Sequence, residues 1–350
     1  MHVGAREATV RLNGSFAGCY TRRAGVGGIS VKVGNMKSCA IASLLRVTAT
    51  WAACTSVLFS CRPAHDTSLP VDEGAKAPDA GAGQPVPTRI VSMAPNLTEI
   101  LFALELDDEI VGVSDFCNYP PAAVAKPKVG GVLNPDIEAI LALEPDLVVN
   151  IPGSASRTVV AQLEGLGIRT AVINARTVDE TFAAIESLGR LTGRREQAAA
   201  LANRMRAELD EIKTRVRTAP RRKTLFVVSA NPLRVAGGTT FIDDLIEIAG
   251  GSNIARGALG KYPQLGLEEI IARQPEVIID STLGPAFSET AAAERHDWWR
   301  QWDAIPAVAT GRIYELDTDV LIRPGPRMSE AALILARAIH PEVFEGNGDR

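Results

Sequence analysis

From residue 89 onward, the chain alternates between short continuous apolar runs and longer segments with apolar residues at helical spacing. The runs "RIVSMAP" (89–95), "DEIVGVS" (108–114) and "LFVVSANP" near 225 have the length and composition of buried strands. The segment "NLTEILFALEL" (96–106) has the helical pattern, and we expect Asn96 to cap it. Strands and helices that alternate at this short spacing predict parallel α/β layers.

Two stretches of the chain repeat one pattern. "IEAILALEPDLVV" (137–149) matches "LEEIIARQPEVII" (267–279), so that Glu138 corresponds to Glu268 and Pro145 to Pro275. Each copy follows a strand that ends in a turn and precedes a further strand, "RTAVIN" (169–174) or "RIYELD" (312–317). The repeat predicts two similar α/β lobes, which arise either from duplication or from shared packing rules.

A long amphipathic segment lies between the two copies. Its apolar stripe recurs at three-and-four spacing over 195–217 and consists of Ala198, Leu201, Met205, Leu209, Ile212 and Val216. Pro220 ends the pattern. We therefore expect an N-terminal lobe (89–190), a bridging helix (191–219) and a C-terminal lobe (220–345), with a stiff link that resists large hinge opening.

The first 88 residues differ in composition from the rest. Residues 1–60 carry seven Lys or Arg and one acid, whereas the remainder carries 30 basic and 40 acidic residues. An acidic body offers no field for phosphates, which argues against nucleic acid as a partner. Fourteen uncharged residues from Val47 are too few to span a membrane and suit a secretory signal.

The signal-like run ends in "LFSC", which resembles the lipobox of bacterial lipoproteins and predicts lipidation of Cys61. Phe59 is bulkier than usual at its position, and the alternative is a cleaved signal with a chance cysteine. Residues 1–61 are then the leader, of which 1–35 are an over-extended start if translation begins at Met36. Residues 62–88, rich in Pro, Gly and Ala, are expected to be a flexible linker.

Motifs for enzyme chemistry are missing from the sequence. After the leader the histidines are few and scattered, and there is no His-Glu-x-x-His, Cys-x-x-Cys or Walker motif. "AGGTTF" (236–241) either presents backbone donors to an anion or simply turns the chain. Secretion, two lobes and no catalytic set together favour a binding protein over an enzyme.

The segments 98–149 and "RIYELDTDVLIRPGPR" (312–327) strongly resemble the substrate-binding proteins of ABC importers for cobalamin and ferric siderophores. The similarity covers about residues 89–340. It implies two three-layer α/β lobes joined by one long bridging α-helix, with a ligand cleft between the lobes. It also implies an extracytoplasmic protein, attached to the membrane only by a lipid anchor, that carries a small metal chelate to an ABC permease dimer. Cobalamin or a related corrinoid is the leading cargo, transported as a ligand and not held as a cofactor.

The resemblance also assigns roles to residues. The expected ligand-binding residues are Phe116, Tyr119, Arg234, Tyr262, Asp319 and Arg323. Tyr119 has an alternative role in holding its own loop, and Arg327 is as well suited to bracing the loop as to meeting ligand. Glu138 and Glu268 are expected to dock onto permease arginines, although an acid in a first helical turn also complements the helix dipole.

The chain departs from the family at two positions where cobalamin binders often carry tryptophan, since Val132 and Ile151 stand there. Trp298, Trp299 and Trp302 are expected to pack within the second lobe. This weakens the case for cobalamin and leaves three alternatives open. One keeps the class and changes the cargo to ferric siderophore or haem, the second is a membrane-coupled sensor, and the third is a secreted enzyme.

Overall fold

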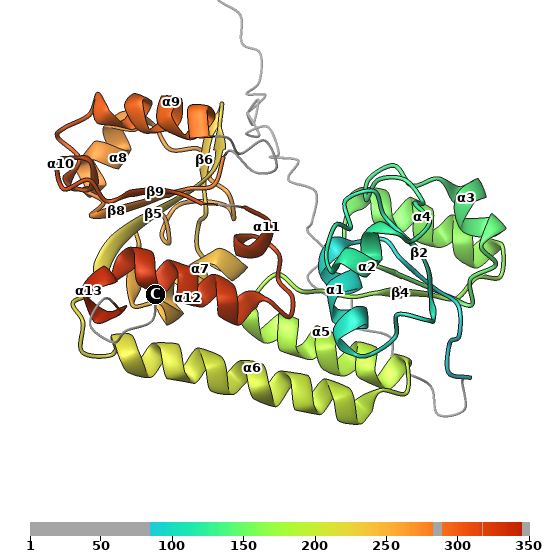
Figure 1. Ribbon diagram of the computed structural model, residues 1–350. Helices are drawn as coiled ribbons and strands as arrows, with labels where there is room; N and C mark the ends of the chain where they lie inside the picture. Colours follow the sequence, from blue (N-terminus) through green and yellow to red (C-terminus); the bar gives the residue numbers. More distant parts are fainter. Residues whose placement is uncertain (1–84, 283–288, 317, 345–350) are drawn as a thin grey trace, which may run out of the picture. The chain divides into compact units, whose positions relative to one another are not determined.

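The structure, a computed structural model, describes residues 85–282, 289–316 and 318–344 (Figure 1). The predicted leader, most of the linker and Cys61 lie outside these residues. Within them the chain forms two α/β lobes joined by a long helix, which confirms the expected fold class. No helix among the described residues combines the length and apolar character needed to cross a membrane.

The first lobe is built on a four-stranded parallel sheet in the order β2-β1-β3-β4. Its elements in chain order are β1 (Ile90–Ser92), α1 (Pro95–Ala103), β2 (Ile110–Val113), α2 (Pro121–Val124), α3 (Ile137–Ala142), β3 (Leu147–Asn150), α4 (Ser154–Gly165), β4 (Thr170–Val172) and α5 (Val178–Leu191). The strands are shorter than the apolar runs that predicted them.

The second lobe repeats this order as β7-β5-β8-β9, all parallel, and adds β6 as an antiparallel edge strand beside the carboxyl end of β5. Its elements are β5 (Arg222–Ala230), β6 (Leu233–Val235), α7 (Phe241–Ile248), β7 (Gly251–Asn253), α8 (Leu267–Arg273), β8 (Val277–Asp280), α9 (Glu289–Arg300), α10 (Pro306–Ala309), β9 (Ile313–Glu315), α11 (Thr318–Leu321), α12 (Met328–Ile339) and α13 (Pro341–Phe344). The sequence predicted parallel layers only, and it did not predict the antiparallel strand β6.

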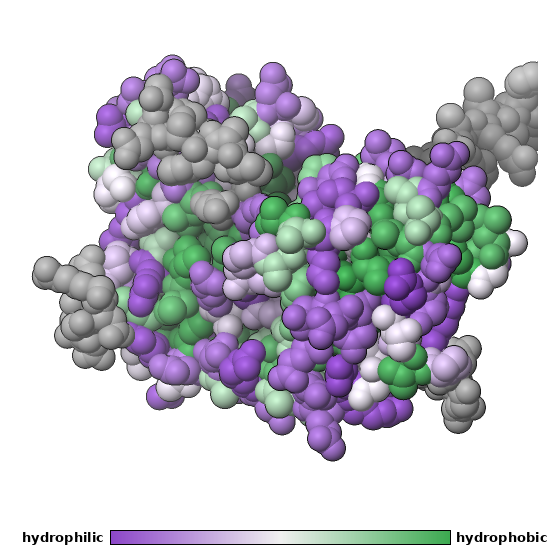
Figure 2. Space-filling view, turned by 45° about the vertical axis from the view of Figure 1, so that its right-hand side comes forward, coloured by the Kyte–Doolittle hydropathy of each residue, from purple (hydrophilic) through white to green (hydrophobic). Residues whose placement is uncertain are grey.

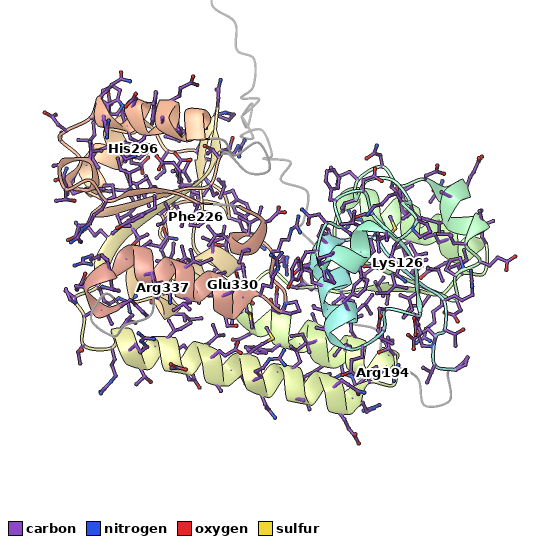
Figure 3. All side chains as sticks on the ribbon, viewed as in Figure 1. Lys126, Arg194, Phe226, His296, Glu330 and Arg337 are labelled. Atoms are coloured by element: carbon purple, nitrogen blue, oxygen red, sulfur yellow. The ribbon has the colours of Figure 1, made fainter. Side chains whose placement is uncertain are left out.

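Strand residues alternate between two apolar layers in each lobe. In β1, Ile90 joins one hydrophobic cluster and Val91 another on the opposite face. In β5, Phe226 is buried on the face that α7 and α12 cover (Figure 3). Leu225 belongs to the cluster that contains Trp299. Each sheet is therefore covered on both sides, as parallel sheets require.

The helix α6 (Arg195–Val216) links the lobes, and it packs against α5 of the first lobe and against α12 and α7 of the second (Figure 1). All six residues of the predicted apolar stripe are buried, which confirms the helix and its orientation. The stripe belongs to a hydrophobic cluster that also contains Ile90 of the first sheet and Phe226 of the second.

The prediction that Asn96 caps α1 is wrong. The helix begins at Pro95, with Ala94 as the N-cap and no side chain bonded to the first turn. Proline is favoured at the first helical position because its missing N–H would have no partner there. Asn96 instead lies in the first turn, and its amide donates to the Pro324 carbonyl oxygen at 3.4 Å.

Candidate functional site

The loop after β2, "SDFCNYPP", combines buried and exposed side chains. Cys117 is a free, buried thiol whose Sγ lies 3.1 Å from the Thr98 hydroxyl and 3.2 Å from the Ser114 hydroxyl. The flanking rings are outside the core, because Phe116 is 60% exposed and Tyr119 is 43% exposed. The loop thus anchors itself through Cys117 and presents two aromatic side chains at the carboxyl edge of the first sheet, where ligands bind in α/β folds.

Tyr119 does not stand alone on the surface. The Arg327 guanidinium lies over its ring, 4.0 Å from the centroid. Arg327 is itself held by Glu99 of α1 through two bonds, Nε to Oε2 at 2.9 Å and Nη2 to Oε1 at 2.6 Å. The geometry gives Arg327 a bracing contact across the lobes, one of the two roles expected for it.

A polar network surrounds this brace, and we call it the Glu99 junction (Glu99, Asn118, Asp319, Arg323 and Arg327). Arg323 contacts Glu99 at 3.5 Å and Asp319 at 2.9 Å, and it donates to the Asn118 side-chain oxygen. The Asn118 amide in turn donates to Asp319. Two arginines face two carboxylates, so the charges balance where α1 and the Phe116 loop meet α11 and the segment after it.

Burial determines the electrostatics of the junction. The Glu99 side chain is 2% exposed, and those of Arg323 and Arg327 are 14% and 15% exposed. Burial works to lower the pKa of Arg327, but the hydrogen bond and negative charge of Glu99 outweigh it and raise the pKa above its usual value. Arg327 therefore stays charged, and Glu99 supplies the charge that a buried guanidinium requires.

The second lobe places Arg234 and Tyr262 together. Arg234 of β6 is exposed and donates to the Tyr262 carbonyl oxygen at 3.3 Å. The Tyr262 ring is 46% exposed, and the burial of its remaining surface raises the pKa of the phenol. The structure thus gathers Phe116, Tyr119, Asp319 and Arg323 around the Glu99 junction and pairs the other two predicted ligand residues in the second lobe.

The predicted docking residues Glu138 and Glu268 are exposed, each in the first turn of its helix. At the start of α3, Asp136 accepts from the Ala139 backbone N–H at 3.0 Å, whereas the N-cap of α8 is Gly266, which has no side chain to cap the helix. Both helices are followed by a residue with positive φ directly before the proline, Glu144 at 46° and Gln274 at 53°. The two copies therefore share a rare backbone feature as well as an apolar pattern.

The tryptophans of α9 and the segment after it pack inside the second lobe, as predicted. Trp299 is fully buried and donates from Nε1 to Asp280 at 2.7 Å, and Trp298 and Trp302 pack around the same cluster. Two surface hollows of about 460 and 300 Å³ flank α6, on its α5 and α12 sides. Neither is lined by a predicted ligand residue, and among the described residues no group of His, Cys, Asp or Glu is placed to hold a metal ion.

Comparison with known proteins defines the family. A family model described as periplasmic binding protein matches residues 90–320. The chain belongs to the periplasmic binding protein family. An ABC transporter substrate-binding lipoprotein of Bacillus subtilis, itself uncharacterised, is 32% identical over 266 residues, which span 74% of this chain and 82% of that protein. A vitamin B12-binding protein of Vibrio cholerae is 31% identical over 244 residues, or 69% of this chain and 86% of its own length.

Solved structures of this periplasmic binding protein family show the same fold. The periplasmic vitamin B12-binding protein of Vibrio cholerae superposes with a TM-score of 0.64 at 29% identity, covering 74% of this chain and 98% of that chain. The periplasmic heme-binding protein of Roseiflexus sp. RS-1 superposes with a TM-score of 0.65 at 27% identity, covering 73% and 98%. These relatives are named as binding proteins of transport systems or of small ligands, and not as enzymes.

Sequence reasoning missed Glu99 and Asn118. The signal for Glu99 was that it is the only charged residue in α1, and buried carboxylates are rare unless paired. Its partners lie more than 220 residues away along the chain, and no local pattern connects them. Asn118 lies between the two aromatic residues of the loop, and its partners Asp319 and Arg323 are more than 200 residues away along the chain.

Proposed function

We propose that this protein binds cobalamin or a related corrinoid between its two lobes and delivers it to the permease dimer of an ABC importer. More coarsely, it is a substrate-binding protein of the class that serves ABC importers for vitamin B12, haem or ferric siderophores, as its family and relatives indicate. That class also makes it an extracytoplasmic protein.

The observation that carries the cargo proposal is the exposed aromatic ring on each lobe. Phe116 and Tyr262 keep 60% and 46% of their surfaces exposed, on loops at the carboxyl edges of their sheets. A soluble protein gains little from such rings unless they contact something, and a flat macrocycle offers a matching apolar face. Arg234, Asp319, Arg323 and Tyr119 would surround it with charged and polar groups.

Titration of the purified protein with cyanocobalamin, followed by calorimetry, tests this cargo. We expect binding in the nanomolar to low micromolar range, and Phe116→Ala should weaken it by about 1–3 kcal/mol if the ring stacks on the ligand, a range taken from base–aromatic stacking. Absence of heat from a folded protein would reject cobalamin. Unchanged affinity in Phe116→Ala would remove that residue from the site.

Haem or a ferric siderophore is the second candidate. Arg234 is an exposed cation beside Tyr262, and such a group suits the carboxylates of haem or of an anionic chelate. A structural relative of similar identity is a heme-binding protein. Parallel titrations with hemin and with a ferric siderophore would favour this candidate if either binds more tightly than cyanocobalamin.

Delivery to the permease is assigned to Glu138 and Glu268. Both are exposed and occupy matching places on α3 and α8. The double variant Glu138→Ala, Glu268→Ala should abolish uptake by cells and keep the ligand affinity of the parent. Normal uptake by this variant would remove the docking role.

Attachment to the membrane is assigned to a lipid on Cys61. One relative is named a lipoprotein, and the "LFSC" motif precedes a linker-like composition. Cys61→Ser should release the protein from the membrane fraction, and continued attachment would point to an uncleaved anchor.

A further inference from the structure

The second lobe carries an unassigned cation beside one of its predicted ligand residues. Lys261 directly precedes Tyr262 in the loop between β7 and α8, and it is half-buried. A single lysine on a protein surface is ordinary and needs no explanation. Lys261 is informative because its charge lies at the boundary of the two lobes, beside an exposed ring, and has no acidic partner of its own.

Backbone contacts fix the loop on both sides of Tyr262. The Gly237 N–H donates to the Lys261 carbonyl oxygen at 2.8 Å. The Val235 N–H donates to the Pro263 carbonyl oxygen at 3.0 Å. Gly237 belongs to the "AGGTTF" motif, and a Cβ at this position would lie 2.9 Å from Cδ of Pro263. This glycine therefore allows the close approach that orders the loop, which lowers the entropy cost of a contact made by Lys261 or Tyr262.

The charge of Lys261 acts on the first lobe. Glu180 of α5 accepts from the Arg176 backbone N–H at 2.7 Å and from the Arg176 guanidinium at 3.3 Å. Burial works to raise the pKa of Glu180, but the hydrogen bonds and charge of Arg176, together with the charge of Lys261, outweigh it and lower the pKa. Glu180 is already paired with Arg176, and Lys261 forms no ion pair with any described residue. Lys261 therefore adds a positive charge that no acid close to it neutralises.

A second cation lies beside Tyr262. Arg234 is exposed, and its guanidinium donates to the Tyr262 carbonyl oxygen at 3.3 Å. Among the described residues it pairs with no carboxylate. Lys261 and Arg234 thus place two positive charges next to a ring that is 46% exposed.

The surfaces that the two lobes offer to a ligand therefore differ in charge. At the Glu99 junction two arginines face two carboxylates, and hydrophobic side chains gather on the visible face of the first lobe (Figure 2). Around Tyr262 two cations remain without a paired acid in the described part of the chain. A carboxylate or phosphate at the edge of a flat ligand would supply the missing negative charge, because recognition depends on complementary charge as well as on buried area.

We propose that Lys261 and Arg234 form an anion subsite beside Tyr262, which binds an acidic group at the edge of the ligand and so orients the ligand between the lobes. The inference rests on the proposed function and deepens it. In cobalamin the acidic group is the phosphate diester, and in haem it is the pair of carboxylates. The flat face of either ligand would contact the aromatic rings while its acidic edge points toward the second lobe.

Two pairs of ligands test the subsite by calorimetry with the purified protein. Cyanocobalamin carries the phosphate and dicyanocobinamide lacks it, whereas hemin carries two carboxylates and its dimethyl ester carries none. In whichever pair binds, Lys261→Gln should weaken the acidic member by about tenfold or more, since hydrogen bonds to charged groups are strong. The affinity for the member without the acid should not change. Lys223→Gln, which changes an exposed lysine near the amino end of β5, is the control and should bind both members as the parent does.

The dependence on salt gives a second measurement. The affinity of the parent for the acidic ligand should fall as the salt concentration rises, and the fall should be smaller in Lys261→Gln, because one of the screened charges is gone. Arg234→Gln should reproduce the selective loss, and it replaces Lys261→Gln if that variant does not fold. Equal losses for both members of a pair, or no loss for either, would overturn the subsite and leave the proposed function intact. A folded parent that binds none of the four ligands would overturn both.

Discussion

Two contacts between the lobes use carboxylates in different ways. At the Glu99 junction, two arginines neutralise two acids, and the four charged side chains are between 2% and 23% exposed. Beside α6, Asp244 of α7 instead accepts from the Val178 N–H at the start of α5, at 2.9 Å. Burial, together with the like charges of Asp243 and Asp179, raises the pKa of Asp244, and the Val178 bond offsets this only in part. One contact is charge-balanced, and the other carries an excess acid.

The two contacts differ in how their carboxylates are neutralised, and this difference should affect how each contact responds to mutation and to pH. A matched buried network is strong only while all its members are present, because removing one leaves an unpaired charge. A carboxylate at a helix N-terminus is a weaker, adjustable contact that depends on pH and on neighbouring acids. We infer that the Glu99 junction holds the Phe116 loop against the second lobe, and that the strength of the Asp244 contact beside α6 varies with pH.

Breaking the Glu99 junction should cause the largest loss of stability. Glu99→Ala leaves Arg323 and Arg327 facing each other without their shared carboxylate, and we expect a loss of about 3–5 kcal/mol in the free energy of unfolding. Urea unfolding monitored by circular dichroism measures it. Glu186→Ala, which removes an exposed pair with Arg206, is the matched control and should cost at most about 1 kcal/mol. Equal losses in the two variants would show that burial does not strengthen the junction.

A smaller effect is expected when the Phe116 loop is detached from the Glu99 junction. Asn118→Ala removes the bonds to Asp319 and Arg323, so the Phe116 loop must be ordered again when ligand binds. We expect ligand affinity to fall by about 0.5–1.5 kcal/mol, measured by calorimetry with whichever ligand the parent binds. Asp115→Ala, exposed in the same loop, should bind as the parent does. If both variants bind normally, the junction does not position the loop.

The smallest effect is expected at the second contact. Asp244→Asn keeps an acceptor for the Val178 N–H and removes the charge. Because the folded pKa of Asp244 is raised, the parent loses stability as pH rises through that pKa, and the variant does not. The variant should therefore melt higher than the parent at pH 7 and equally at pH values below the unfolded pKa, near 3.8. Asp210→Asn, which changes an exposed acid on α6, should melt at the temperature of the parent at both pH values. A difference between Asp244→Asn and the parent that does not vary with pH would contradict the raised pKa of Asp244.

The sequence predicted the parts of the fold that rest on periodicity. The α6 stripe and the alternating strands were found because each obeys a local repeat, of 3.6 or of 2 residues. The predicted N-cap of α1 was wrong by two residues, Asn96 in place of Ala94, because Pro95 at the first helical position outweighed the capping preference of Asn96. The antiparallel strand β6 was missed because three residues after a turn carry too little pattern.

The candidate site was predictable only where aromatics and charges stood out in loops. Phe116 and Tyr262 are exposed in the structure, and Asp319 of α11 forms an ion pair with Arg323, two residues after the helix ends. The pairing of Arg323 and Arg327 with Glu99 required knowledge of which loop meets which helix. Such long-range polar contacts leave no spacing in the sequence, so only the folded chain reveals them.

The apolar stripe of α6 also has a thermodynamic consequence. One continuous hydrophobic cluster contains strand residues of both sheets and the buried face of this helix. Neither lobe can lose its packing without exposing apolar surface that belongs to the other. Heat should therefore melt the two lobes in one cooperative calorimetric transition, so that the pair behaves as a single folding unit built from two halves.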